Sequence, residues 1–200
     1  MLVIRDLLLS PKRFGDLLRG LPRIPTNILA ARLKEFEKAG IVRRRLLAQS
    51  PSAVAYELTP YGQELKPILL SLGVWGARAL GAPHPDDVLN PDSVVLALEA
   101  TFQKDAARGV NASFEVHVGD AVVHARVVDG VLDAAPTPLP AADLVIEAGS
   151  ALRPLLMGEL SPSAALSSGA VQITGDRPLF DRFVEIFRLP ASLGVSDRIA

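Results

Sequence analysis

The chain has 200 residues, a formal net charge of −1, 49% hydrophobic residues and no cysteine. This composition is typical of a globular chain long enough for one large or two small domains, and the lack of cysteine excludes disulfides, thiolate metal sites and cysteine nucleophiles. No apolar run reaches the roughly 18 residues of a membrane-spanning helix, so we expect a cytoplasmic protein with no membrane partner.

The charges are divided unevenly along the chain. Residues 1–80 contain 13 Lys and Arg against 6 Asp and Glu, whereas residues 81–200 contain 8 against 16. A basic segment suits a phosphate-bearing partner. The stretch "GAPHPDDVLNPDS" at 81–93 has three prolines and no apolar period, which is typical of a linker. We therefore predict two domains, 1–80 and 94–200.

Three helices are predicted in the first 40 residues. The first covers 2–9 and is stopped by Ser10-Pro11, and the second covers 13–21. The segment "PRIP" that follows can only turn, and the third helix then begins near Thr26 and ends at Gly40. Two short helices joined by a tight turn predict a helix-turn-helix.

The third helix is predicted to have two different faces. Leu29, Leu33 and Phe36 are spaced to pack inward. The remaining face and its flank are expected to present Thr26, Asn27, Ala30, Ala31, Arg32 and Lys34. Small residues let a helix backbone enter a major groove, and the Asn27 amide offers both a donor and an acceptor to a base edge.

The next segment changes to the period of two that is typical of strands. The runs 41–47 and 53–58 predict a two-stranded hairpin, because "AQSPS" separates them. Arg43, Arg44 and Arg45 lie in the first run, where guanidinium groups can meet the phosphates beside the groove. Lys12 and Arg13 are expected to add to this basic surface. A basic run can also be only a solvated strand face.

A helix-turn-helix followed by such a hairpin predicts a winged helix. Thr59-Pro60 then opens another helix, with a kink expected near Pro67. Its wide apolar stripe is formed by Leu65, Leu69, Leu72, Trp75 and Leu80. A stripe of this width on a helix that leaves a small domain predicts a homodimer interface, which suits a two-fold DNA site.

The motifs "RDLL", "RFGDLL", "RLKEFEKAGIV" and "YELTPYG" occur in this order over residues 2–76. In sequence and spacing this segment resembles the HxlR family of winged-helix transcriptional regulators. The resemblance implies a dimeric regulator that binds double-stranded DNA. Members of that family normally have another helix before "RDLL", and this chain begins within that element. The cysteine used by family members that sense electrophiles is absent here. Winged helices can also dock proteins without touching DNA.

The acidic half begins with a short apolar segment and continues with alternating ones. Residues 94–103 predict a helix, with a strand as the alternative for so short a run. The segments "ASFEVHV", "AVVHARVV" and "VLDAA" alternate, and Gly119-Asp120 and Asp129-Gly130 between them predict tight turns. An antiparallel meander is therefore expected.

The last 60 residues predict two more strands and three helices. The strands are expected over 142–148 and 170–176. Between them, Ser150 is expected to cap a helix that runs through Leu160, and Ser161-Pro162 to start a second. The closing helix is expected over 177–189.

A sheet covered by helices on one side predicts an α+β domain. The segment "ADLVIEAGSALRPLLMGELSPSAALSSGAVQITGDRPLFDRFVEIF" resembles the sterol-carrier-protein-like domain, and the resemblance extends over roughly residues 94–189. It implies an apolar cavity for a hydrophobic small molecule. The candidate lining residues are Leu155, Leu156, Met157, Phe180, Phe183 and Phe187. The alternative is that these side chains fill the core completely.

No enzyme signature occurs in the sequence. The chain lacks a G-x-S-x-G elbow, a phosphate loop, a dinucleotide fingerprint and H-E-x-x-H. His117 and His124 fall on one face of adjoining strands, but without an Asp, Glu or Cys in register they predict exposed residues and no metal site. We therefore predict a non-enzymatic regulator without cofactors whose second domain senses a hydrophobic ligand or stabilises the dimer. The alternative is a hydrophobic-ligand carrier whose winged helix docks a protein.

Overall fold

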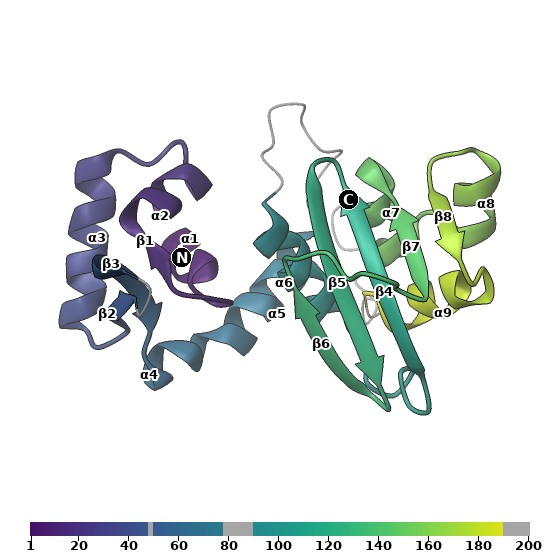
Figure 1. Cartoon of the computed structure of the whole chain (residues 1–200), viewed down its shortest axis with the longest axis horizontal. Coiled ribbons are helices and arrows are strands. Elements are labelled where there is room, and N and C mark those ends of the chain that lie inside the picture. The colour runs from purple at the N-terminus through teal and green to yellow at the C-terminus, as the bar shows by residue number, and fades with distance from the viewer. Residues whose placement is uncertain (48–49, 78–89, 190–200) are drawn as a thin grey trace, which may run out of the picture. The chain divides into compact units, whose positions relative to one another are not determined.

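The computed structural model describes residues 1–47, 50–77 and 90–189 (Figure 1). The chain divides into two compact units, Met1–Gly76 and Ala77–Ala200, and each is described by itself. Helices and strands are present in both, which agrees with the predicted α+β class. Within the described ranges, no helix is long and apolar enough to cross a membrane.

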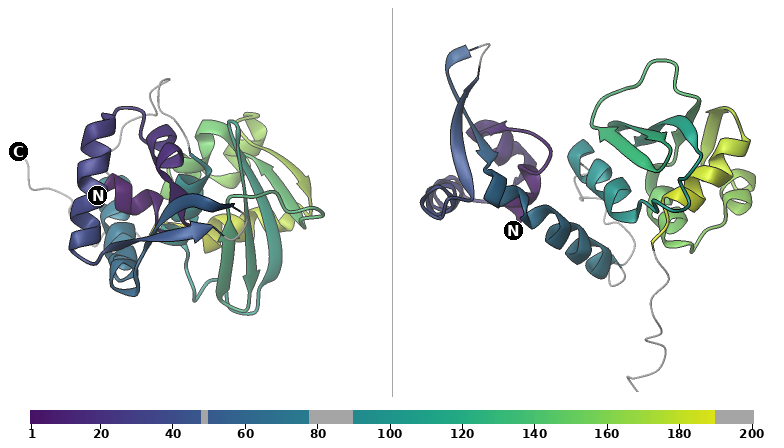
Figure 2. Two further views of the ribbon diagram at one scale, coloured as in Figure 1. Left: turned by 60° about the vertical axis from the view of Figure 1, so that its left-hand side comes forward. Right: turned by 90° about the horizontal axis from the view of Figure 1, so that it is seen from below.

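The N-terminal unit combines short helices with a small sheet. Its elements are α1 (Leu2–Asp6), β1 (Lys12–Arg13), α2 (Phe14–Gly20), α3 (Thr26–Lys38), β2 (Val42–Leu47), β3 (Ser50–Leu58), α4 (Pro60–Gln63) and α5 (Leu65–Ala77). The strands form an antiparallel sheet in the order β1-β3-β2. The β2–β3 hairpin extends beyond the helices of its own unit (Figure 2). This arrangement is a winged helix-turn-helix, as the sequence predicts.

The core of this unit lies between its helices and the base of the sheet. Leu17, Leu29 and Leu33 are at most 1% exposed, and Val42 and Leu58 close the core from paired positions on β2 and β3. Phe36, the third residue predicted to point inward, is only half-buried. The inward stripe of α3 is therefore narrower at its C-terminal end than its spacing indicates.

One feature of this unit differs from the sequence prediction, and another refines it. Strand β1 was not expected, because two residues show no periodicity and become a strand only by pairing with β3. The predicted kink near Pro67 lies at Glu64, a single residue that separates α4 from α5 while keeping helical dihedral angles, φ −61° and ψ −18°. The physical reason is that Pro67 has no N–H for the carbonyl of residue 63, and its ring would clash with that carbonyl.

The C-terminal unit is a five-stranded mixed sheet with helices on one face (Figure 1). Its elements are α6 (Pro91–Thr101), β4 (Asn111–Val118), β5 (Ala121–Val128), β6 (Val131–Ala135), β7 (Leu144–Glu147), the 3-10 turn η1 (Gly149–Ala151), α7 (Leu152–Met157), α8 (Pro162–Ser167), β8 (Gln172–Gly175) and α9 (Pro178–Ile186). The strand order is β6-β5-β4-β7-β8, with β4 and β7 parallel. Alternate residues of β4 and β5 are buried, so one face of the sheet packs on the core.

The meander was predicted correctly. Asp129 and Gly130 both have positive φ, 45° and 77°, as a two-residue type I′ turn requires. Helix α6 confirms the helix predicted for 94–103. It begins at Pro91, within the stretch predicted as a linker. The preceding residues 81–89 of that predicted linker lie outside the described residues.

One predicted helix cap is wrong. Ser150 lies inside the 3-10 turn η1, and neither η1 nor α7 has a side-chain cap. Helix α7 ends at Met157 and not at Leu160, because Gly158 adopts a left-handed φ of 72° and terminates it. The second cap is confirmed, since the Ser161 hydroxyl accepts a hydrogen bond from the backbone N–H of Ala164 at 3.2 Å.

Candidate functional site

Helix α3 presents an open, mostly uncharged surface. Leu29 and Leu33 are 0% and 1% exposed and fix the orientation of the helix. The six residues predicted on the other side are all exposed: Thr26, Asn27, Ala30, Ala31, Arg32 and Lys34. Arg32 pairs with Glu35 at 2.8 Å. Ile28, which the sequence analysis did not single out, is 44% exposed beside Asn27 and offers an apolar contact of the kind that thymine methyl groups accept.

The three arginines of the hairpin do not share a surface. They are consecutive in β2, so Arg44 lies on the opposite face from Arg43 and Arg45. The three side chains are similarly exposed: 62% for Arg43, 60% for Arg44 and 58% for Arg45. The single basic surface predicted for Arg43, Arg44 and Arg45 is therefore divided by the alternation of the strand.

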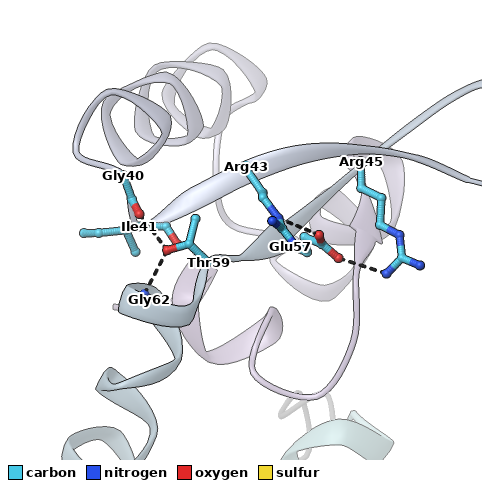
Figure 3. Close-up of polar contacts among 7 residues, drawn as sticks. All are labelled: Gly40, Ile41, Arg43, Arg45, Glu57, Thr59 and Gly62. Atoms are coloured by element: carbon cyan, nitrogen blue, oxygen red, sulfur yellow. Dashed lines mark hydrogen bonds and ion pairs between the residues drawn. The ribbon is translucent and has the colours of Figure 1, made fainter.

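One carboxylate joins the two arginines that share a face. Arg43 Nε donates to Glu57 Oε1 at 2.7 Å, and Arg45 Nη1 donates to Glu57 Oε2 at 3.1 Å (Figure 3). Glu57 comes from the adjacent strand β3, directly opposite Arg43, and its side chain is only 12% exposed. Burial raises the pKa of this carboxyl, but the hydrogen bonds and charges of Arg45 and Arg43 outweigh burial and lower the pKa overall.

Arg44 ties the hairpin to the helix with the open surface. Its Nε and Nη2 atoms contact the two oxygens of Glu37 in α3, at 2.8 Å and 3.3 Å. The guanidinium carbon also lies over the ring of Tyr56, 5.8 Å from the centroid, within cation–π range. Arg44 therefore helps to fix the position of the hairpin relative to α3.

The two basic residues of β1 extend these two faces. Arg13 and Arg45 both pair with Ala55 of the central strand, so they share its face, whereas Lys12 pairs with Tyr56 on the face of Arg44. The structure therefore brings Arg13, Arg43 and Arg45 together on one face of the sheet. Lys12 and Arg44 lie on the other.

A polar junction connects the end of α3, the base of the hairpin and α4. The Thr59 hydroxyl donates to the carbonyl of Gly40 at 2.6 Å and accepts from the N–H of Gly62 at 3.0 Å (Figure 3). A Cβ at Gly62 would lie 2.2 Å from the carbonyl oxygen of Ile41, so only glycine fits there. The C-terminal end of α3 and the N-terminal end of α4 are thereby held together.

Helix α5 has no buried residue along its 13 positions. Its predicted stripe is exposed or half-buried: Trp75 is 68% exposed and Leu72 is 45% exposed, while Leu65 and Leu69 are half-buried. Ile68, at 59%, belongs to the same apolar surface. The predicted member Leu80 lies outside the described residues.

The predicted ligand-pocket residues of the C-terminal unit are mostly buried against one another. Leu155, Leu156, Phe180, Phe183 and Phe187 are at most 4% exposed, whereas Met157 is half-buried. The Phe183 and Phe187 ring centroids are 4.8 Å apart, and Phe183 lies 5.3 Å from Phe114 of β4. These rings form an aromatic cluster between α9 and the sheet.

The two histidines have a carboxylate neighbour that the sequence analysis did not recognise. His117, Glu115 and His124 share the face of the sheet that lies away from the helices and that the segment between β6 and β7 crosses, with Glu115 opposite His124. His117 Nε2 lies 2.7 Å from Glu115 Oε1, and the N–H of Leu139 donates to Glu115 Oε2 at 2.6 Å. The bond with His117, together with that N–H, lowers the pKa of Glu115 despite its burial. Among the described residues, no three or more His, Cys, Asp or Glu side chains are grouped so that they could hold a metal ion.

The fold and the basic surfaces of the N-terminal unit define a winged helix-turn-helix protein. The family model of the HxlR-like helix-turn-helix matches residues 1–83. The uncharacterized HTH-type transcriptional regulator YvaP of Bacillus subtilis (strain 168) is 35% identical over 77 residues, which cover 38% of this chain and 71% of YvaP. Through this unit, the chain belongs to the HxlR family.

Other comparisons cover smaller parts of the matched proteins. The uncharacterized HTH-type transcriptional regulator YkvN of the same organism is 41% identical over 75 residues, or 38% of this chain and 64% of YkvN. The chain thus spans about three fifths of the length of some curated relatives. A solved structure of the sec-alkylsulfatase Pisa1 from Pseudomonas sp. is 20% identical with a TM-score of 0.46, over 52% of this chain and 17% of that one. That likeness is too low to assign a fold or a function.

Proposed function

We propose that the chain is a transcriptional regulator that binds double-stranded DNA through α3 and the hairpin. The observation that carries the proposal is the open surface of α3, whose six predicted contact residues are all exposed beside a sheet with arginines on both faces. Small side chains admit the helix backbone to the major groove, and the guanidinium groups meet the flanking phosphates. The relatives YkvN and YvaP, which carry the name of transcriptional regulators, support this function.

Selection of bound DNA from a random pool tests the proposal. We expect an enriched sequence with two inverted half-sites, because a two-fold dimer reads a palindrome. We also expect binding to fall steeply with salt, since each neutralised phosphate contributes about 0.9 to the slope of log affinity against log salt. Failure to bind any duplex at low salt would contradict the proposal and favour a winged helix that docks a protein.

Dimerisation through α5 is the second part of the proposal. Ile68, Leu72 and Trp75 project from a helix that buries none of its residues in its own unit. A second copy of the helix would remove this apolar surface from water, and a two-fold interface would match the two half-sites. Sedimentation of the full chain measures the dimer directly.

The third part concerns the C-terminal unit, which we propose to be a sterol-carrier-like domain that binds a hydrophobic small molecule. Its support is the aromatic and aliphatic cluster between α9 and the sheet, with the half-buried Met157 at the end of α7. A ligand that binds only the folded state raises the melting temperature with concentration. A screen of fatty and aromatic compounds on the full chain, repeated with Met157→Trp, tests this part. A wild-type melting temperature that stays constant throughout would leave the domain as a dimer stabiliser.

A further inference from the structure

The face of the sheet that carries Arg43 and Arg45 has the composition of an anion site. The side chains of Arg43 and Arg45 are each more than half exposed, and Arg13 lies on the same face two strands away, beyond β3. Glu57 is the carboxylate between Arg43 and Arg45, so the three arginines leave a local excess of positive charge. A phosphodiester backbone is the polyanion that matches a row of fixed guanidinium groups.

Glu57 contacts each arginine through part of its fork only. It accepts from Nε of Arg43 and from Nη1 of Arg45, so neither the Nη groups of Arg43 nor Nη2 of Arg45 is engaged by this carboxylate. A guanidinium carries five N–H donors in a planar fork, and one held edge fixes the plane of the other donors. The same carboxylate therefore orients two forks while leaving donors of both available.

A carboxylate close to DNA could also act in the opposite sense and repel phosphate. The burial of Glu57 argues against this, because its side chain is 12% exposed while the arginines above it are 62% and 58% exposed. A phosphate that approaches this face meets the guanidinium groups first. Without Glu57, the like charges of Arg43 and Arg45 would repel each other, and the two side chains would move apart into several rotamers. Binding a phosphate would then cost the rotamer entropy of both side chains.

We propose that Glu57 is a positioning residue that holds Arg43 and Arg45 as a preformed seat for a phosphate of the DNA backbone. This inference rests on the DNA-binding function proposed above, and it deepens that function by separating the arginines into two groups. Arg44, whose fork is held by Glu37 and Tyr56, belongs to the structure of the hairpin and α3. Arg43 and Arg45 form the phosphate contact.

The sign of one substitution distinguishes positioning from repulsion. Glu57→Gln removes a negative charge, so electrostatics alone would tighten binding to a random-sequence duplex and steepen the salt dependence. Positioning requires the opposite result, a loss of affinity of about threefold to tenfold, in the range expected for one exposed ion-pair network. Asp105→Asn is the matched control, because it removes an exposed carboxylate from a single arginine, Arg108, outside the winged helix, and we expect no comparable loss of affinity.

A double-mutant cycle shows whether Glu57 acts through the arginines. In the Arg43→Ala and Arg45→Ala background, Glu57→Gln should have no further effect on affinity, whereas a merely structural role would leave its cost unchanged. Should Glu57→Gln not fold, as its melting temperature would show, Arg43→Lys with Arg45→Lys replaces it. These changes keep the charge but lose the fork, so we expect weaker binding with the same salt slope.

The outcomes separate the two proposals. A wild-type chain that binds no duplex at low salt overturns the proposed function itself. A wild-type chain that binds, while Glu57→Gln binds as tightly or more tightly, overturns the positioning role and leaves DNA binding intact. Undiminished affinity in the double lysine variant overturns the positioning role in the same way.

Discussion

The two units place their large apolar side chains differently. Helix α5 of the N-terminal unit buries none of its residues, and Trp75 is 68% exposed. Helix α9 of the C-terminal unit buries Phe180, Phe183, Val184 and Ile186 against its own sheet. The sequences of the two helices differ as well, because α9 has charged residues at Asp181, Arg182 and Glu185 beside its apolar face, whereas the only charged residue of α5 is Lys66. The difference teaches that the N-terminal unit leaves part of its apolar surface outside its own core, whereas the C-terminal unit buries its aromatic residues internally.

The largest expected effect is on the stability of the C-terminal unit. Phe183 is fully buried between Phe114 and Phe187, so Phe183→Ala should lower the free energy of unfolding by about 3–5 kcal/mol. Urea unfolding, monitored by hydrogen exchange of the backbone amides in β4 and β7, measures this loss of unfolding free energy. The control is Val131→Ala, a residue of the same sheet that is 64% exposed, for which we expect a change within about 0.5 kcal/mol. Equal losses in Phe183→Ala and Val131→Ala would contradict the conclusion that the buried aromatic cluster stabilises this unit more than its exposed residues do.

The complementary substitution in α5 should affect association and not folding. Trp75→Glu should weaken the dimer by roughly 3 kcal/mol, because each copy loses a large buried side chain worth about 1.5–3 kcal/mol. Analytical ultracentrifugation over a concentration series measures the shift. Tyr61→Glu provides the control, since Tyr61 of α4 is similarly exposed at 63% but lies outside the α5 stripe. An unchanged dimer in Trp75→Glu would place the interface elsewhere.

A smaller effect is expected on the open surface of α3. Asn27 is exposed, so Asn27→Ala should leave the melting temperature unchanged and cost about 1–3 kcal/mol of discrimination between the selected site and a random duplex. Competition binding with the two duplexes measures this difference. Lys34→Ala is the matched variant from the same surface, and it should weaken binding to both duplexes alike, because we expect its ammonium group to contact a phosphate, which carries no sequence information. A uniform loss in both variants would remove the base-reading role of Asn27.

The smallest effect concerns the face of the C-terminal sheet that lies away from the helices. Glu115→Gln removes the carboxylate that binds His117 and the N–H of Leu139, which should cost about 1 kcal/mol near neutral pH. The pKa of Glu115 is lowered from its ordinary 4.5, so its contribution is present above that value and is lost as the pH falls through the lower, folded pKa. Melting temperatures of both proteins should therefore converge in acid. Glu147→Gln, an exposed change on the neighbouring strand, should show no such convergence.

Much of the fold follows from local signals in the sequence. The leucine spacing of α3, the proline after Thr59 and the Asp129-Gly130 pair each encode an element by themselves, and all three elements are present. Strand β1 was not predicted, whereas the kink predicted near Pro67 is present and lies at Glu64. The first depends on a partner strand more than 40 residues away in sequence, and the second is the effect of a proline on the preceding turn.

The candidate site was predictable in its residues but not in its pairings. The exposure of the α3 surface follows from helical period, and the separation of Arg44 from its neighbours follows from strand alternation. The partners Glu57 and Glu37 do not follow in the same way. Which residue of β3 faces Arg43 depends on the register of the hairpin, and the contact of Arg44 with α3 depends on how the hairpin leaves the helix. Glu115 is different, because it lies two residues before His117 in the same strand, and strand alternation alone could have placed it beside that histidine.

The close approach of Gly62 to the backbone of Ile41 also bears on how this chain can be altered. Every amino acid other than glycine would push a carbon into that carbonyl oxygen, so a point mutation at this codon meets a steric barrier. Stepwise substitution at Gly62, where the end of α3 meets α4, is therefore blocked. Beyond Glu64 the constraint is released, because α5 has no buried residue in its own unit. Recombination that exchanges α5 and whatever follows it would leave residues 1–64 of the winged helix undisturbed, which makes the position after Glu64 a natural crossover point for building chimeras.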